Sequence, residues 1–441
     1  MITGQHSSEL ELVSGSRQTR RLLLFAATTG YQLRAFTEAA RRANLDVSLA
    51  TDRCHVLEDP WGDRAIPVRF DQPEAALEAL SGSRFDGIAA LGDRPALLAG
   101  QVALALGLPF HPPAAVRACH DKFLARGIFK AAGLPVPTFF RIAVSEDPHR
   151  AAAQAGFPCV LKPLGLSASR GVIRADNGRE FAAAFERIRA LLARSPDIVA
   201  SREETNQFIQ VEEFIPGREF AVEAIVTNGR MKLLAIFDKP DPLDGPFFEE
   251  TLYVTPSREP AEIQQLIRDT VERAIGALGL WHGPVHAELR VNEQGAWMLE
   301  AAARPIGGLC AKALRFGPAM PLEELVARHA VGDDISGLER SDPASGVLMI
   351  PIPKPGVYRG VEGIEEARAT AHIEDVIITA KTGQELVPLP EGSSYLGFIF
   401  ARANSPAEVE RALRQAHGKL TFLISTALPA LRPQALDRGG T

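Results

Sequence analysis

The feature that constrains this chain most is a pair of strands joined by a tight loop. Apolar and polar side chains alternate over residues 285–292, which is the period-two pattern of a half-buried strand, and residues 297–301 form its expected partner. The linker Glu293-Gln294-Gly295 fits a three-residue hairpin loop in which glycine takes the left-handed position. This loop predicts a register that sets Asn292 opposite Ala296.

Two carboxylates face each other in this predicted hairpin. The register sets Glu288 directly across from Glu300, and opposed residues on one face have Cβ atoms roughly 5 Å apart. Two ionised carboxylates at that distance repel unless a cation lies between them, and a hard divalent ion with oxygen ligands meets that need. The alternative is a solvated face, or ion pairs with Arg290 and Arg304, because structural ion pairs are common.

The composition is that of an ordinary globular protein. The chain has 441 residues, of which 46% are hydrophobic and 23% charged, so we expect two to four domains. Its four cysteines show no Cys-x-x-Cys spacing, which argues against structural zinc and against a disulfide framework, and favours a reducing cytoplasm. A net charge of −6 predicts no general attraction to nucleic acid or to an anionic membrane.

Both ends of the chain are expected to lie outside the folded core. Residues 1–20 are polar and contain no apolar run typical of a signal peptide, so we predict a disordered leader. Residues 426–441 are expected to form a loose tail. No stretch approaches the roughly 20 continuous apolar residues that a membrane-spanning helix needs.

Strand and helix patterns alternate in the first part of the chain, residues 21–112. Three apolar strands are expected, separated by helical patterns, and this alternation favours a parallel sheet with covering helices. The expected strands lie at 21–27, 46–50 and 86–91. The loop Thr28-Thr29-Gly30 lies where such sheets bind ligands but lacks the spacing of a dinucleotide site, so it is scaffold or part of a substrate pocket.

The next region, residues 113–339, contains a loop of small residues. A short apolar strand at 159–163 carries Lys162 and leads into the loop from Gly165 to Gly171. Small residues and flanking glycines let backbone N–H groups turn inward around an anion, although the Walker pattern is absent. The alternative is a flexible turn, which is the more frequent meaning of such a segment.

Antiparallel strands are expected after this loop. Residues 208–215, 218–226 and 231–237 are strand-like and indicate an antiparallel sheet. A long loop at 238–253 and an amphipathic helix at 262–278 follow. From residue 340 to 425 the pattern predicts a smaller α+β unit against the central region, with strands at 347–352, 372–379, 396–401 and 420–424 and a helix at 406–417.

Several motifs in this order resemble those of the ATP-grasp ligases, closest to the L-amino-acid ligase and biotin-carboxylase-like branch. The resemblance covers about residues 20–425. It is carried by His120-Asp121-Lys122, Val160-Leu161-Lys162-Pro163, the Gly165–Gly171 loop, Glu212 to Glu219, and Glu288 with Glu300. The resemblance implies an α/β and α+β fold of ATP-grasp architecture, with a Rossmann-like first domain (21–112), an ATP-grasp domain (113–339) with a lid near 160–226, and a small α+β domain (340–425).

The resemblance also implies residues that bind ATP. Lys122 and Lys162 resemble the two lysines that meet the phosphates, and the Gly165–Gly171 loop resembles the lid that closes over them. A lysine taken alone is usually a solvated surface residue. The segment Glu212 to Ile215 resembles the hinge that reads adenine, and Glu219 resembles the acid that binds ribose. The implied nucleotide-binding residues are Lys122, Lys162, Gly165, Ser167, Ser169, Gly171, Glu212, Glu213, Phe214, Ile215 and Glu219.

The resemblance implies a divalent ion and a substrate arginine. Glu288 and Glu300 resemble two magnesium ligands, with manganese as another candidate ion. Ala302 stands where many relatives have asparagine, which leaves one or two ions as alternatives. Arg304 resembles an arginine that contacts the substrate carboxylate or acyl phosphate, and the alternative is a salt bridge to Glu288 or Glu300. Lys239 is a further candidate phosphate contact.

The implied activity is that of an ATP-dependent carbon–nitrogen ligase in the cytoplasm. It forms an amide, such as a dipeptide, through an acyl phosphate and releases ADP and phosphate. The implied partners are a small carboxylate and an amine, expected to be amino acids, with no nucleic acid or membrane. The oligomeric state stays open, with a homodimer as one alternative because dimers are common in the family. Two alternatives stay open at this point. One is a carboxylase-like or nucleotide-biosynthesis enzyme that uses a small acid, and the other is a catalytically weak ATP-binding module.

Overall fold

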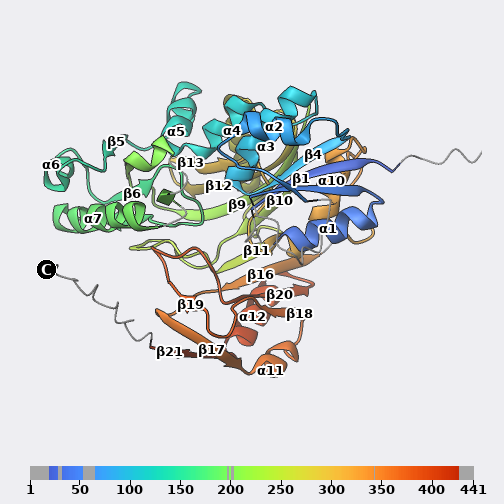
Figure 1. The fold of residues 1–441 in the computed structure, drawn as a ribbon. Helices are drawn as coiled ribbons and strands as arrows, with labels where there is room; N and C mark the ends of the chain where they lie inside the picture. The colour runs from blue at the N-terminus through green and yellow to red at the C-terminus, as the bar shows by residue number, and fades with distance from the viewer. Residues whose placement is uncertain are drawn as a thin grey trace, which may run out of the picture.

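A computed structural model of the chain describes residues 19–27, 32–52, 65–195, 198–199, 203–341 and 343–426. The predicted leader (apart from residues 19 and 20), the predicted tail after residue 426 and the loop Thr28-Thr29-Gly30 lie outside the described residues. Figure 1 shows the C-terminal strands, in orange and red, below the rest of the molecule.

The first region contains a parallel sheet, as its alternating pattern predicts. Four strands pair in parallel in the order β3-β2-β1-β4. Strand β1 is buried along almost its whole length because helices cover the sheet. The elements are β1 (Arg21–Ala26), α1 (Leu33–Arg42), β2 (Asp46–Thr51), β3 (Ala65–Pro67), α2 (Pro73–Leu80), β4 (Gly87–Leu91) and α3 (Asp93–Leu106).

A second, antiparallel sheet carries the loop of small residues. Its strands pair in the order β5-β8-β6-β7, and α7 packs on it with a core of phenylalanine, leucine and isoleucine side chains. Two helices, of which α5 is capped by Asp121, lead into it. The elements are α4 (Pro113–His120), α5 (Lys122–Ala131), β5 (Phe139–Ala143), α6 (Pro148–Ala152), β6 (Cys159–Pro163), β7 (Ile173–Ala175), α7 (Gly178–Arg194), the 3-10 helix η2 (Glu204–Gln207) and β8 (Phe208–Glu213).

An eight-stranded sheet forms the centre of the molecule in the order β13-β12-β9-β10-β11-β16-β20-β18. Helix α9 shares one apolar core with α3 and with residues of β9 and β12, while α1 and α10 share a second core with other residues of β9 and with β10. The elements are β9 (Arg218–Thr227), β10 (Arg230–Asp238), β11 (Leu252–Thr255), α9 (Ala261–Leu278), β12 (Gly283–Asn292), β13 (Gly295–Ala302), the 3-10 helix η3 (Cys310–Ala313), β14 (Arg315–Phe316), β15 (Met320–Pro321) and α10 (Leu322–Ala330).

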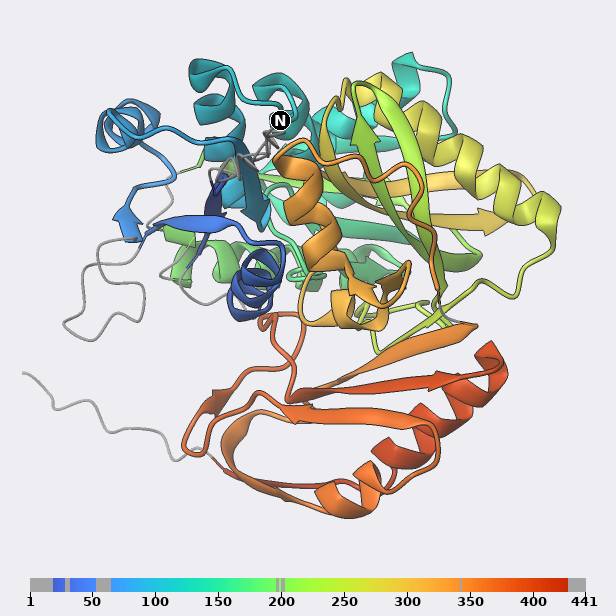
Figure 2. The same ribbon diagram turned by 90° about the vertical axis from the view of Figure 1, so that its right-hand side faces the viewer.

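Three C-terminal strands, β16, β20 and β18, extend this central sheet, while β19, β17 and β21 form a separate three-stranded sheet. Figure 2 shows the C-terminal strands, in orange and red, below the rest of the molecule. Helix α12 begins with a capping box between Ser405 and Glu408, which explains why its predicted bounds are correct. Strand β11, before residue 340, pairs with β16, after it, in the same sheet. The predicted domain boundary at residue 340 therefore stays a prediction. The elements are β16 (Ala344–Ile350), β17 (Gly356–Glu362), α11 (Ile364–Arg368), β18 (Ile373–Ile378), β19 (Glu385–Leu386), β20 (Gly397–Ala403), α12 (Pro406–His417) and β21 (Thr421–Ser425).

The predicted hairpin loop is wrong by one residue, yet the predicted carboxylate pair is confirmed. Asn292 pairs with Gly295, so the loop has two residues instead of three. A register shift between Glu288 and Leu289 then compensates, and Glu288 pairs with Glu300. Such a bulge inserts one extra residue into one strand and changes the register beyond it.

One predicted sheet is in fact two. Strand β8 pairs with β5 and β6, whereas β9 and β10 lie in the central sheet. The turn at Pro216-Gly217 separates them. Gly217 has a φ of +122°, and a Cβ there would lie 2.4 Å from Val291 O, so this close approach requires glycine. Among the described residues, no helix is long and apolar enough to cross a membrane.

Candidate functional site

One face of the central strands β9, β12 and β13 carries a ladder of charged side chains. Directly paired residues share a face, and so do residues two positions apart along a strand. The opposite face of β9 packs into the apolar core, which leaves the polar face for a site. The paired rows are Glu219 with Arg290, then Ala221, Glu288 and Glu300, then Glu223, His286 and Ala302.

A cavity lies between this charged face and the antiparallel sheet that carries the loop of small residues. It brings together most of the predicted site residues, although they come from distant parts of the chain. The predicted residues that line it are Lys122, Lys162, Ser167, Ser169, Glu212, Phe214, Ile215, Glu219, Glu288 and Glu300.

Lys162 meets Glu212 at one end of this cavity. The Lys162 ammonium contacts the Glu212 carboxylate, which also accepts from Arg126 Nε at 3.0 Å and from Gln210 Nε2 at 2.8 Å. Burial alone raises the pKa of Glu212, but Arg126 and Lys162 outweigh it and bring the pKa to about 2. Burial is also the main reason that the pKa of Lys162 lies below its usual value. Glu212 is therefore ionised and fixes the position of the lysine.

Lys122 links the hairpin to the loop of small residues. Its Nζ lies 3.8 Å from Glu300 Oε2 and donates a hydrogen bond to Leu166 O. The lysine is the first residue of α5, so the helix cap at Asp121 also fixes where its side chain starts. A cation is thereby placed between Glu300 and the backbone of the loop.

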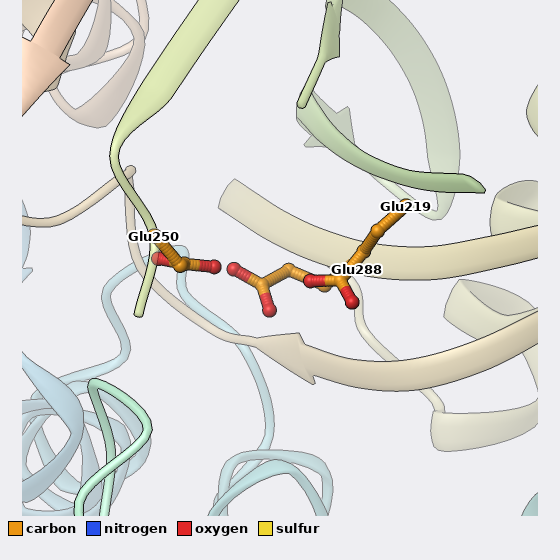
Figure 3. Close-up of side chains that lie close together, drawn as sticks. All are labelled: Glu219, Glu250 and Glu288. Carbon is orange, nitrogen blue, oxygen red and sulfur yellow. The ribbon is translucent and has the colours of Figure 1, made fainter. Parts of the chain in front are cut away.

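Lys239 lies beside the cavity, surrounded by three carboxylates. Its Nζ is 2.8 Å from Glu219 Oε1 and 3.3 Å from Glu288 Oε1, and it also contacts Glu250. Oxygen atoms of these three carboxylates lie within 4.8 Å of one another, and Figure 3 shows the side chains converging from three segments. Burial lowers the pKa of Lys239, but Glu219 and Glu250 outweigh it and raise the pKa well above the usual value.

The ligands available here suit a hard divalent cation. Glu288 and Glu300 offer only carboxylate oxygen atoms, and their side chains are 15% and 27% exposed, so both remain open to the cavity. The more buried carboxylates nearby, Glu212 and Glu223, are held by Arg126 and His286. Residues that fit magnesium or manganese are therefore present, with Glu250 as an addition that the sequence pattern did not reveal.

Arg304 pairs with a residue that we did not predict. Its guanidinium donates to both carboxylate oxygens of Asp93, at 2.8 and 3.4 Å, instead of pairing with Glu288 or Glu300. Burial raises the pKa of Asp93, but Arg304 outweighs it and brings the pKa to about 2. Asp93 begins α3 directly after strand β4, so the first region contributes to this end of the site.

The two glycines of the predicted phosphate loop have packing roles in this structure. Gly171 has a φ of +74°, a Cβ on it would lie 2.6 Å from Pro163 Cγ, and its N–H donates to Pro390 O at 2.8 Å. A Cβ on Gly165 would lie 2.8 Å from Thr205 Oγ1. Neither glycine lines the cavity, whereas Ser167 and Ser169 between them do.

In the predicted hinge, Glu212 and Glu213 point to opposite faces of strand β8. Glu212 faces the cavity, while the next side chain, Glu213, is exposed and accepts a hydrogen bond from Thr138 N at 3.0 Å. The Glu213 side chain therefore does not line the cavity, and its predicted nucleotide contact stays a prediction for the backbone of the hinge. Phe214 and Phe248 stack with ring centroids 6.4 Å apart and line the cavity together with Val160. Among the described residues, the Ile215 N–H has no hydrogen-bond acceptor.

Several residues of this site were missed from the sequence. Arg126 lies four positions after Lys122, which puts both on one face of α5. Glu223 and His286 each lie an even number of positions from a predicted site residue on their strands, so strand alternation predicts that they share its face. Glu250 and Asp93 lie in a loop and at a helix start, where no periodicity identifies them.

Comparison with known proteins agrees with this geometry. A family model described as an ATP-grasp domain matches residues 155–313, and one described as L-amino acid ligase C-terminal domain 2 matches residues 348–425. The crystal structure of an L-amino acid ligase from Bacillus licheniformis superposes with a TM-score of 0.75 at 25% identity, over 92% of this chain and 99% of that one. The chain belongs to the ATP-grasp superfamily.

Other relatives support this ATP-grasp assignment. An alanine–anticapsin ligase from Bacillus subtilis is 29% identical over 215 residues, which span 46% of this chain and 44% of the relative. A carboxyaminoimidazole ribonucleotide synthase from Aspergillus clavatus, solved with ATP, shares the fold with a TM-score of 0.67 at 17% identity, over 91% of this chain and 98% of that one. The protein is an ATP-binding, ATP-dependent carbon–nitrogen ligase of the carboxylate–amine ligase type.

Proposed function

We propose that this ATP-grasp protein couples a carboxylic acid to an amine through an acyl phosphate, with amino acids as the substrates. An oxygen of the substrate carboxylate attacks the γ-phosphorus of ATP, and ADP leaves. The amine nitrogen then attacks the acyl carbon and loses a proton, and phosphate leaves as the amide forms. The similarity to an L-amino acid ligase over most of both chains supports amino acids as the substrate class.

The observation that carries this proposal is the meeting of lysines and open carboxylates in one cavity. Lys122 and Lys162 supply fixed cations for the phosphates of ATP, which are too costly to bury without them. Glu288 and Glu300 are the residues that would hold magnesium. When bound there, the ion neutralises charge that develops as the γ-phosphoryl group transfers.

The remaining lining residues suit the rest of the nucleotide. The apolar side chains of Phe214, Phe248 and Val160 support binding of a flat base between them, and the Ile215 N–H, which has no acceptor among the described residues, is the candidate donor to that base. Glu219 also lines the cavity and is the residue that would bind the ribose hydroxyls. Ser167 and Ser169 face the cavity from the loop and close over the phosphates.

Arg304 and Lys239 are the two candidate contacts for the substrate carboxylate or the acyl phosphate. The Arg304 guanidinium is held in a fixed plane by Asp93 and is one candidate contact for the substrate carboxylate or acyl phosphate. Lys239 contacts Glu288, which is also part of the proposed metal site. When Glu288 binds the ion instead, the Lys239 ammonium becomes the second candidate contact for the substrate.

A panel of amino acids tests the proposed reaction. The protein is incubated with ATP, magnesium and pairs of amino acids, and both phosphate release and product mass are followed. Phosphate release that depends on an acid and an amine together, with a dipeptide mass, supports the ligase. Release with bicarbonate or another small acid supports the carboxylase-like alternative. ATP binding without turnover on any pair contradicts the proposal and supports a binding module.

The carboxylate pair is tested by Glu300→Gln. This variant keeps the size of the side chain but loses its charge, so we expect turnover to fall by about 10²-fold or more, as is typical of lost electrostatic stabilisation. Glu213→Gln is the matched control, because Glu213 lies outside the cavity, and its turnover should stay near that of the unmodified protein. Near-normal turnover of Glu300→Gln contradicts the metal assignment.

A further inference from the structure

A buried chain of contacts runs from Glu223 through His286 to Glu288. His286 Nδ1 lies 2.5 Å from Glu223 Oε1, and His286 Nε2 lies 3.2 Å from Glu288 Oε1. The side chains of Glu223 and His286 are only 1% and 5% exposed, so neither is solvated. Neither residue is explained by the proposed reaction.

Hydrogen bonds hold the imidazole on both sides. Each ring nitrogen of His286 faces a carboxylate, and an ionised carboxylate only accepts hydrogen bonds. Each ring nitrogen is therefore paired with one carboxylate, and the imidazole bridges Glu223 and Glu288. Lys239 and Tyr253 reach the same Glu288 oxygen, at 3.3 and 3.4 Å, so this carboxylate is held by three groups on one side.

The chain of contacts continues to the segment that carries Arg304. The second oxygen of Glu223, Oε2, accepts the backbone N–H of Ile306 at 3.1 Å. The carbonyl of Ile306 in turn accepts from Gln32 of the first region. One oxygen of Glu223 thus contacts His286, which contacts Glu288, and the other oxygen accepts the backbone N–H two residues after Arg304.

We propose that Glu223 and His286 are a positioning pair, which sets Glu288 and the Arg304–Ile306 segment relative to each other. The pair acts through hydrogen bonds and touches neither nucleotide nor substrate. This inference rests on the proposed role of Glu288 in holding a divalent ion. Its consequence is that loss of either member weakens binding of the ion at Glu288, since groups that orient metal ligands typically affect metal affinity 10- to 100-fold.

The experiment compares ADP binding with and without Mn²⁺, followed by calorimetry, in His286→Gln and Glu223→Gln. We expect the dissociation constant of Mn²⁺–ADP to rise about 10- to 100-fold in both variants, and that of metal-free ADP to stay unchanged. A general disturbance of the fold weakens both. The matched control is His282→Gln, a buried histidine just before β12 whose ring nitrogens hydrogen-bond no carboxylate among the described residues, and for this variant neither constant should change.

The double variant tests whether the two residues act as one unit. If they do, Glu223→Gln adds little to the effect of His286→Gln on Mn²⁺–ADP binding. Additive effects, an unchanged Mn²⁺–ADP constant, or equal weakening of metal-free ADP overturns the inference. If the unmodified protein binds Mn²⁺–ADP but forms no amide with any substrate pair, the proposed reaction fails while these binding results still decide the positioning role.

Discussion

Two buried histidines four residues apart differ in charge, since one ring is neutral and the other is protonated. His282, just before β12, stacks on His329 with ring centroids 4.1 Å apart, and neither of its ring nitrogens has a side-chain partner among the described residues. Burial lowers its pKa. Burial also acts on His286, but Glu223 outweighs it and raises the pKa to about 9.

The difference comes from what other strands and helices place beside each ring. The neighbours of His282 are further histidines, His329 of α10 and His111 before α4, whose pKa values burial lowers to about 3 and about 4. The neighbours of His286 are carboxylates from β9 and from its own strand. One end of this segment therefore favours neutral rings and the other holds a charge, and only the charged end lies at the candidate site.

The largest expected effect is that of Glu223→Ala on stability. This change leaves the buried His286 without its main anion and the Ile306 N–H without an acceptor, so the free energy of unfolding should fall by about 3–5 kcal/mol. Urea denaturation measures it. Glu385→Ala, at an exposed position of β19, is the control and should change stability by less than about 0.5 kcal/mol. A loss below about 1 kcal/mol for Glu223→Ala would show that His286 is not held as a cation.

Mild acid should destabilise the protein through the other histidines. The pKa values of His111 and His329 are lowered to about 4 and about 3, so they contribute stability above the unfolded-state value of roughly 6.5, and it is lost as the pH falls below that. Between pH 6.5 and 5 these two histidines should together remove roughly 2–4 kcal/mol. Burial raises the pKa of Glu250 to about 7, so its carboxyl is protonated in the folded state over the same range and offsets part of this loss. The raised pKa of His286 leaves its contribution fully present in this window.

Urea denaturation across this pH range, repeated with His329→Phe, measures the effect. The variant lacks one of the rings that must be protonated on unfolding, so its stability should fall less steeply with pH. An equal slope in both proteins would contradict the assignment of the loss to these histidines.

The smallest expected effect is that of His282→Phe at pH 7.5. The ring of His282 makes no side-chain hydrogen bond among the described residues, so an aromatic ring without nitrogen should change the free energy of unfolding by less than about 1 kcal/mol, with either sign. The measurement is again urea denaturation. A loss as large as that of Glu223→Ala would mean that the neutral histidines are as strongly held as the charged one.

Periodic patterns predicted much of the fold. The parallel sheet of the first region, helices α9 and α12, and the pairing of Glu288 with Glu300 follow from alternation, helical spacing and caps. These signals are local, because each depends on residues within a few positions of one another. The domain boundaries and the roles of the site residues stay predictions, and the oligomeric state stays open.

The sequence by itself determined which carboxylates share a face, since strand alternation carries that information. Only the tertiary structure decided that Arg304 pairs with Asp93, more than two hundred positions away, and that Gly171 donates to Pro390. It also decided which histidine is charged. The physical reason is that hydrogen bonds and burial act between elements that meet in space, and no local pattern records which elements those are.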